Sequence, residues 1–125
     1  MSYLRATNAI TGIMLADRVR RAGNFFSRSV GLIGRRSLEP GEGLHLVPCR
    51  AIHTFFMRTA IDAAFLDERG EVVKLFSALP PWCVTRFHRR ASSVLELPAG
   101  TLERSGTRVG HRVFFECGPA GSFSR

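Results

Sequence analysis

Lysine is nearly absent from this sequence, since 17 of its 18 basic residues are arginine and the formal net charge is +8. Compositional bias explains this if arginine simply takes the place of lysine across the surface. We favour this explanation, and the alternative is a phosphate-binding surface, because guanidinium groups pair bidentately with phosphate oxygens. The arginines are scattered, and neither a glycine-rich phosphate loop nor an aromatic-basic RNA motif accompanies them. Nucleic acid therefore stays an open candidate partner.

Long hydrophobic runs are also missing. No apolar stretch approaches the roughly 18 to 20 residues that a membrane helix needs, so we expect no membrane partner. Leu4 is followed at once by Arg5, which leaves no apolar core for a signal peptide. The hydrophobic content of 45% excludes a disordered chain. We expect one cytoplasmic domain over residues 1–117, with its core at about 16–113, and a flexible tail over 118–125.

Cysteine is scarce and odd in number, with Cys49, Cys83 and Cys117 and no C-x-x-C motif, which is typical of reduced thiols in the cytoplasm. The histidines and cysteines lack the spacing of a zinc site, so we expect neither a metal nor another cofactor. Cys49 and His53 could form a thiolate–imidazolium pair, but an extended chain separates them by roughly 13 Å. A buried or turn-lining role is therefore favoured for Cys49.

The apolar pattern predicts many short strands and little helix. We expect strands over residues 10–15, 19–22, 44–47, 52–58, 61–66, 71–79, 92–97 and 111–117, a helix over 24–34, a helical turn within 99–105, and a loosely held polar terminus over 1–9. A hairpin turn is expected at residues 67–70, where Asp67 serves the turn. The fold class is mainly β (α+β): a single compact antiparallel β-sandwich or barrel-like domain with one or two short helices.

The expected strand at 52–58 organises the chain and carries most of the candidate chemistry. His53, Thr54 and Arg58 interrupt its apolar pattern, and Asp62 follows the turn at 59–60. These residues form either a polar network that fixes strand register, or a pocket in which His53 and Asp62 manage protons while Arg58 holds an anionic group. Arg58 and Asp62 are expected within salt-bridge reach, and His53 joins them only if the strand is twisted or bulged.

Trp82 and Glu96 carry two further expectations. Trp82 follows two prolines and either covers a sheet edge or walls the ligand pocket. Glu96 alternates with Leu95 and Leu97, so we expect its carboxylate to point to solvent or to a basic partner.

An ordered series of motifs extends beyond this region. It consists of FSRSVGL at 26–32 with Arg35 or Arg36, GL at 43–44, PC at 48–49, IHTFFMR at 52–58, ID at 61–62, FLD at 65–67, PW at 81–82, VLELPAG at 94–100 and Gly110. This series, over residues 16–113, resembles the prokaryotic family called domain of unknown function 192. The resemblance implies a compact, mostly β domain with short helices and no established reaction.

The chain departs from that family pattern at two places. Thr59 and Ala60 stand where the pattern has a proline after the arginine, and His111 stands where it has an aspartate after glycine. The second departure removes a carboxylate and leaves Asp62 as the main candidate acid. The sequence contains no serine elbow and no evident carboxylate pair, so enzyme status and oligomeric state stay open.

The predicted function is a small soluble domain that binds a small anionic ligand in a polar pocket of His53, Thr54, Arg58, Asp62 and Trp82. The alternatives are a basic protein associated with nucleic acid, and a structural or interaction domain without catalysis.

Overall fold

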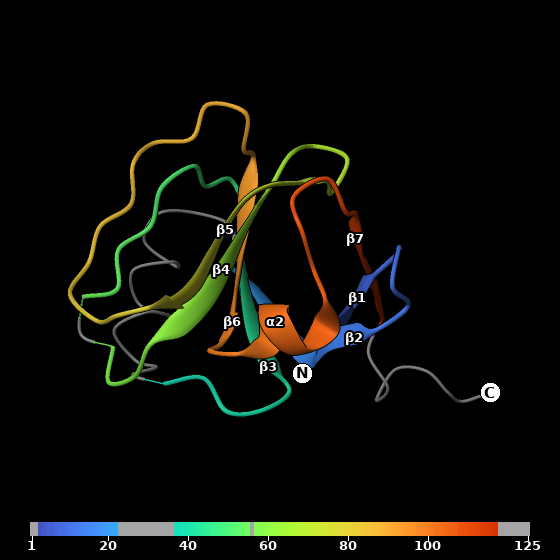
Figure 1. Cartoon of the computed structure of the whole chain (residues 1–125), viewed down its shortest axis with the longest axis horizontal. Helices are drawn as coiled ribbons and strands as arrows, with labels where there is room; N and C mark the ends of the chain where they lie inside the picture. The colour runs from blue at the N-terminus through green and yellow to red at the C-terminus, as the bar shows by residue number, and fades with distance from the viewer. Residues whose placement is uncertain (1–2, 23–36, 56, 118–125) are drawn as a thin grey trace.

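The computed structural model describes residues 3–22, 37–55 and 57–117, which form a curled seven-stranded sheet with one short helix (Figure 1). In chain order the elements are β1 (Leu4–Asn8), β2 (Met14–Ala22), β3 (Glu42–Leu46), β4 (Ile61–Leu66), β5 (Val72–Leu79), β6 (Ser93–Pro98), α2 (Thr101–Ser105) and β7 (Val113–Cys117). The spatial order is β5-β4-β6-β3-β2-β1-β7. The prediction of a mainly β, barrel-like fold is confirmed.

The sheet is mixed, which differs from the expected antiparallel arrangement. β2 and β3 pair in parallel, whereas the other paired strands are antiparallel. A parallel pair needs a crossover connection of about a dozen residues or more, and residues 23–41 supply that length. Neither periodicity nor turn residues could reveal this pairing.

The two edges of the sheet meet at one end, so the sheet is a half-barrel. The Val113 amide donates to the Gly70 carbonyl at 2.9 Å, and the Val72 amide donates to the His111 carbonyl at 2.8 Å. These bonds join the start of β5 to the chain entering β7, and Glu71 and Arg112 form an isolated bridge there. The concave face of the half-barrel is thereby bounded on both sides at this end.

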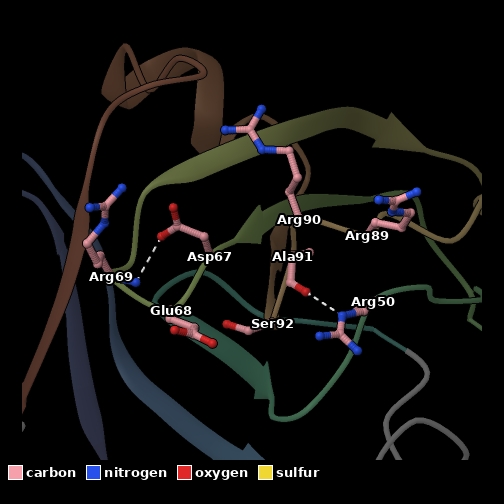
Figure 2. A pocket seen from close by; sticks show the side chains of 8 residues that line it. All are labelled: Arg50, Asp67, Glu68, Arg69, Arg89, Arg90, Ala91 and Ser92. Atoms are coloured by element: carbon pink, nitrogen blue, oxygen red, sulfur yellow. Dashed lines mark hydrogen bonds between the residues drawn. The ribbon is translucent and has the colours of Figure 1, made fainter.

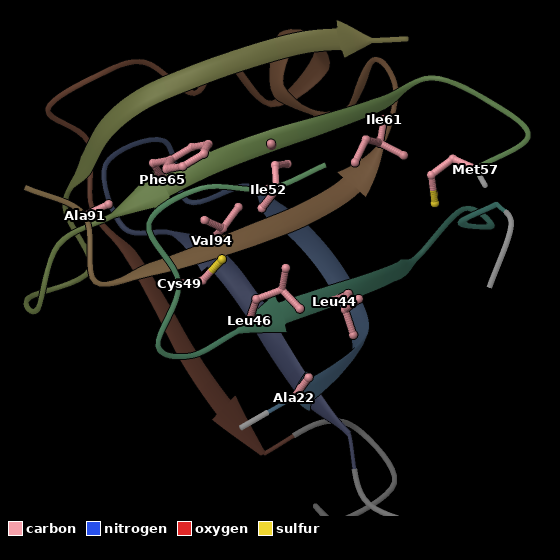
Figure 3. Packing of buried hydrophobic residues seen from close by; sticks show 11 residues of the cluster. Ala22, Leu44, Leu46, Cys49, Ile52, Met57, Ile61, Phe65, Ala91 and Val94 are labelled. Carbon is pink, nitrogen blue, oxygen red and sulfur yellow. The ribbon is translucent and has the colours of Figure 1, made fainter. Parts of the chain in front are cut away.

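Central strands β4 and β6 are buried on both faces, and successive residues enter two different cores. Val94 and Phe65 belong to the outer core, which also contains Cys49, Ile52 and Met57 from a loop that crosses the sheet (Figure 3). Leu95 and Leu97 belong to the inner core, which residues from β1, β2, β4, β5, β7 and α2 complete. We call these clusters the outer core and the inner core.

The predicted strand over 52–58 was wrong. Residues 48–55, 57 and 58 cross the outer core as a loop, which we call the strap, and among these described residues the β-pairing is a single isolated bridge between His53 and Val84. The Thr54 amide donates to the Cys83 carbonyl at 2.9 Å, and the Thr85 amide donates to the Ile52 carbonyl at 2.9 Å. The strap is apolar because it packs on the outer core, and no continuous ladder of hydrogen bonds accompanies that packing.

The N-terminal predictions were also wrong. Residues expected to be loosely held form β1, which pairs with both β2 and β7. The two short strands expected over 10–15 and 19–22 are one strand, β2, and the turn lies before it: Asn8 Oδ1 accepts bonds from the amides of Ile10 and Thr11.

The remaining predicted elements correspond well where the structure describes them. The strands expected over 44–47, 61–66, 71–79, 92–97 and 111–117 are β3, β4, β5, β6 and β7 within a few residues, and the helical turn is α2. Gly70 adopts a φ of 83° at the predicted hairpin turn. The helix expected over 24–34 and the tail at 118–125 lie outside the described residues.

Candidate functional site

Asp62 is fully buried and its carboxylate joins two secondary-structure elements. Its Oδ1 accepts the Ala78 amide at 2.8 Å, and its Oδ2 accepts the Leu102 amide at 2.9 Å. Ala78 holds an unusual positive φ of 54° at the end of β5, and Leu102 lies in the first turn of α2. The carboxylate therefore satisfies a helix-terminal amide and an amide at a strained backbone position, both of which need acceptors.

The structure does not bring Asp62 together with the other predicted site residues. Asp62 bonds to an inner-core residue, whereas the strap with His53 and Thr54 covers the outer core on the opposite face of β4. Within the described ranges no ion pair links Arg58 to Asp62.

Thr54 is buried and ties the strap to the chain that follows β5. Its hydroxyl donates to the Pro80 carbonyl at 2.6 Å and accepts the Cys83 amide at 2.8 Å. These bonds replace part of the ladder that a strand would have formed, so Thr54 has a clear structural role.

His53 and Trp82 are brought together through an aromatic ring between them. The Phe55 ring centroid lies 4.7 Å from His53 and 5.5 Å from Trp82, and His53 Nδ1 accepts the Phe55 amide at 3.2 Å. Trp82 is 62% exposed, and Arg58 is exposed nearby in the chain. Whether this group binds a ligand stays a prediction.

Glu96 is buried with 1% exposure, so the expectation that it points to solvent was wrong. It pairs with Leu44 and Ala63, whose side chains belong to the outer core, and its Oε2 has no hydrogen-bond partner among the described residues. Desolvation raises the pKa of this carboxyl group to about 8. Glu96 alternates with leucines because β6 lies between two cores, and both of its faces are buried.

The sequence reasoning missed a cavity of about 330 Å³ beside the β4–β5 turn (Figure 2). We call it the arginine cavity, and it is lined by Arg50, Arg69, Arg89 and Arg90 with Asp67, Glu68, Ala91 and Ser92. Asp67 Oδ1 accepts the amides of Arg69 and Glu71 at 2.9 Å, which confirms its predicted role in the turn. Arg50 Nε donates to the Ala91 carbonyl at 2.8 Å, which fixes one guanidinium at the cavity wall.

A second cavity, of about 430 Å³, opens where the two edges of the half-barrel meet. We call it the mouth cavity, and it is lined by residues of β3, β4, β6 and β7, including His45, Leu66, Ser93, Val113 and Phe115, and by Arg21, Arg69 and Arg112. Asp67, Glu68, Arg69 and Ser92 line both cavities, which therefore adjoin at the β4–β5 turn.

His45 and Ser93 form a buried polar pair in the wall of the mouth cavity. His45 Nε2 lies 3.0 Å from Ser93 Oγ, and the imidazole stacks on Phe115 with 4.3 Å between ring centroids. Burial, together with the positive charge of Arg21, lowers the pKa of His45 to about 4, so the ring is neutral at pH 7.

This pair has the distance of a nucleophile and its base but lacks other parts of that machinery. His45 Nδ1 has no partner within the described residues, so no third group orients the ring. A base with a pKa near 4 also removes a proton poorly at neutral pH. The arrangement therefore fits hydrogen bonding better than nucleophilic catalysis.

The cysteines offer little chemistry in this structure. Cys49 is buried, and its thiol donates to the Ala51 carbonyl at 3.1 Å. In the described parts of the chain, no three side chains among histidine, cysteine, aspartate and glutamate gather as a metal site. Among the same residues, no helix has the length and apolar character needed to cross a membrane.

Solved structures with the same fold come from two bacteria. A Sinorhizobium meliloti protein superposes with a TM-score of 0.75 at 24% identity, covering 91% of this chain and 92% of that one. A Novosphingobium aromaticivorans protein of unknown function also superposes with a TM-score of 0.75, at 20% identity, covering 89% of this chain and 82% of that one. At these identities the likeness concerns the fold alone.

Sequence relatives carry the comparison further. A UPF0127 protein of Pyrococcus furiosus is 36% identical over 112 residues, covering 85% of this chain and 93% of the relative. A UPF0127 protein of Pyrococcus abyssi is 33% identical over 112 residues, covering 85% of this chain and 92% of the relative. Residues 6–115 match the model of DUF192, described as "Uncharacterized ACR". The chain therefore belongs to the uncharacterized DUF192 family.

Proposed function

We propose that the domain binds a small ligand carrying an oxyanion, either a phosphate or a carboxylate, in the arginine cavity. The observation that carries this proposal is the lining of one cavity of about 330 Å³ by four arginines. Guanidinium groups match the geometry of both oxyanions through paired N–H donors. The volume also lies at the lower end of the range typical of small-molecule pockets, which is about 300 to 1,000 Å³.

The local charge balance supports an anion. Two carboxylates, of Asp67 and Glu68, face four guanidinium groups, and Asp67 is already engaged by the amides of the turn. Within the described residues, neither Arg89 nor Arg90 pairs with a carboxylate. Their charges are therefore available to a ligand at little cost in broken ion pairs.

Calorimetric titration with inorganic pyrophosphate and with phosphate at low salt tests this proposal. The double variant Arg89→Gln/Arg90→Gln should weaken binding by about tenfold or more, because it removes two charged donors. The matched control is Arg58→Gln, which removes an exposed arginine of the strap and should leave the affinity unchanged. If binding is lost in Arg58→Gln but kept in the double variant, the proposal is wrong and the ligand binds at the strap.

The strap remains the second candidate site for the same ligand. There the predicted pocket is reduced to His53, Thr54, Arg58 and Trp82, because Asp62 bonds to α2 on the other face of β4. The Arg58→Gln titration above measures this candidate directly. The predicted cytoplasmic location is kept as part of the proposal, since the odd number of cysteines without a C-x-x-C motif is typical of reduced thiols.

Nucleic acid is the second candidate function, and exposed aromatic residues beside arginines favour it. Phe87 is 63% exposed, and the Arg50 guanidinium carbon lies 5.9 Å from its ring centroid. Trp82 is also exposed on the same segment between β5 and β6. Proteins that bind single strands combine such stacking surfaces with positive charge.

A further inference from the structure

We infer that the mouth cavity is a separate binding site for a small carboxylate with an apolar body, and that Ser93 donates a hydrogen bond to it. This site differs from the arginine cavity in its position inside the half-barrel and in its apolar wall. The inference does not depend on binding at the arginine cavity.

The position of the cavity follows from the curl of the sheet. The inner core fills the concave face from α2 up to Leu66, Leu95 and Val113. Beyond these residues the space widens into an open cavity of about 430 Å³, which is bounded on one side where β5 and the chain entering β7 are hydrogen-bonded. Mouths of barrel-like sheets are common ligand sites, because the fold leaves them open while the walls stay rigid.

The His45–Ser93 pair has two hydrogen-bond donors but forms only one hydrogen bond between its own members. Neutral His45 carries one N–H and Ser93 carries one O–H, and the 3.0 Å contact between Nε2 and Oγ uses only one of them. Neither His45 Nδ1 nor Ser93 Oγ has another partner among the described residues. In either tautomer, therefore, one buried donor is left without an acceptor, which is costly unless a ligand or water supplies one.

Ser93 is the donor that a ligand can use. His45 Nδ1 is shielded from solvent, and the Phe115 ring stacks on the imidazole. The useful tautomer is therefore the one in which Nε2–H donates to Ser93 Oγ. The serine proton is then free to point to a ligand oxygen in the cavity that both residues line.

The remaining lining defines the class of ligand. Leu66, Val113 and Phe115 offer an apolar wall, whereas Arg21 and Arg112 bring positive charge to the same cavity. Neither arginine is ion-paired within the described residues, and the charge of Arg21 reaches far enough to act on His45. A small aliphatic or aromatic carboxylate fits the apolar wall, the positive charge and the Ser93 donor, since its body is apolar and its negative head accepts hydrogen bonds.

The test is a titration of isotope-labelled protein with benzoate and with hexanoate, in which NMR monitors the signals of the histidine rings. The chain has four histidines, so the His45 ring signals can be assigned by single substitutions. We expect either carboxylate to shift the His45 signals in a saturable manner. Arg112→Gln and Ser93→Ala should each weaken binding by about tenfold, because each removes one hydrogen-bonding group.

Controls separate this site from the arginine cavity. Arg104→Gln, at an exposed arginine that lines neither cavity, should leave the carboxylate-induced shift of the His45 signals unchanged, and phosphate should not shift those signals. Because Ser93 is buried, its variant is compared with wild type by thermal melting, and Arg112→Gln gives a second measurement at an exposed residue. Unmoved His45 signals at saturating carboxylate, or affinity unchanged in Arg112→Gln, would overturn the inference while leaving the pyrophosphate titration as an independent result.

Discussion

Glu96 shows how far a single side chain can depart from its ordinary ionisation. Its carboxyl group lies in the outer core without a partner for Oε2, so the charged form pays a large desolvation penalty. Since the pKa rises from 4.5 to about 8, the group is mostly protonated at neutral pH. A proton on Glu96 is therefore part of the folded structure at pH 7.

This proton makes stability depend on pH. The folded pKa is higher than the unfolded one, so the contribution is complete below about pH 4.5 and is lost as the pH rises through about 8. We expect the free energy of unfolding to fall by about 1.4 kcal/mol per pH unit within this window from Glu96 alone. Glu96→Gln should remove that slope.

Urea unfolding at pH 5, 6, 7 and 8 measures the slope, and the difference between wild type and Glu96→Gln isolates Glu96. Glu103→Gln is the matched control, because Glu103 is exposed on α2 and should leave the slope unchanged. Parallel pH profiles for wild type and Glu96→Gln would show that the carboxyl group is not held neutral.

At the scale of the elements, Asp62 joins β4 to both the end of β5 and the start of α2. A five-residue helix cannot be stable alone, so α2 depends on such contacts and on burial of Leu102. The strap depends in the same way on Thr54, which holds it to the chain after β5. Hydrogen bonds from side chains thus take the place of backbone strand pairing where α2 and the strap are attached to the sheet.

Asp62 substitutions test that connection. Asp62→Ala leaves the buried Leu102 amide and the part-buried Ala78 amide without their side-chain acceptor, which should cost about 2 to 4 kcal/mol of unfolding free energy. Asp62→Asn should cost less, because its amide oxygen can still accept one of the two bonds. Asp17→Asn, at a half-exposed carboxylate paired with Arg18, should change stability by less than about 1 kcal/mol. Urea denaturation compares the three variants, and equal costs for alanine and asparagine would contradict this role.

At the scale of the whole molecule, the net charge of +8 attracts any polyanion. If the small-ligand proposal holds, we expect oligonucleotides to bind weakly at about 50 mM salt and not at about 200 mM, because few phosphates are contacted at once. Gel shifts with single-stranded and duplex oligonucleotides measure this. Binding that persists at the higher salt, prefers single strands and is lost in Phe87→Ala would instead establish the nucleic-acid function.

The curl of the sheet gathers residues that are distant in the chain. The two adjoining cavities collect Arg21, Arg50, Arg69, Arg89, Arg90 and Arg112, which looked scattered in the sequence. His45 and Ser93 likewise meet only because β3 pairs with β6. Neither cavity could be predicted from spacing, since each is formed by segments that the topology brings together.

The sequence by itself determined the mainly β character, most of the strands, the hairpin at Asp67 and the family. These properties follow from local alternation, turn residues and ordered motifs, which a chain displays without its neighbours. Tertiary structure decided that the chain around His53 and Thr54 forms a strap, that Glu96 is buried and that the arginines converge. Alternation reports that a side chain meets an apolar surface, but only the fold determines whether that surface is a paired strand, a core on one side, or cores on both.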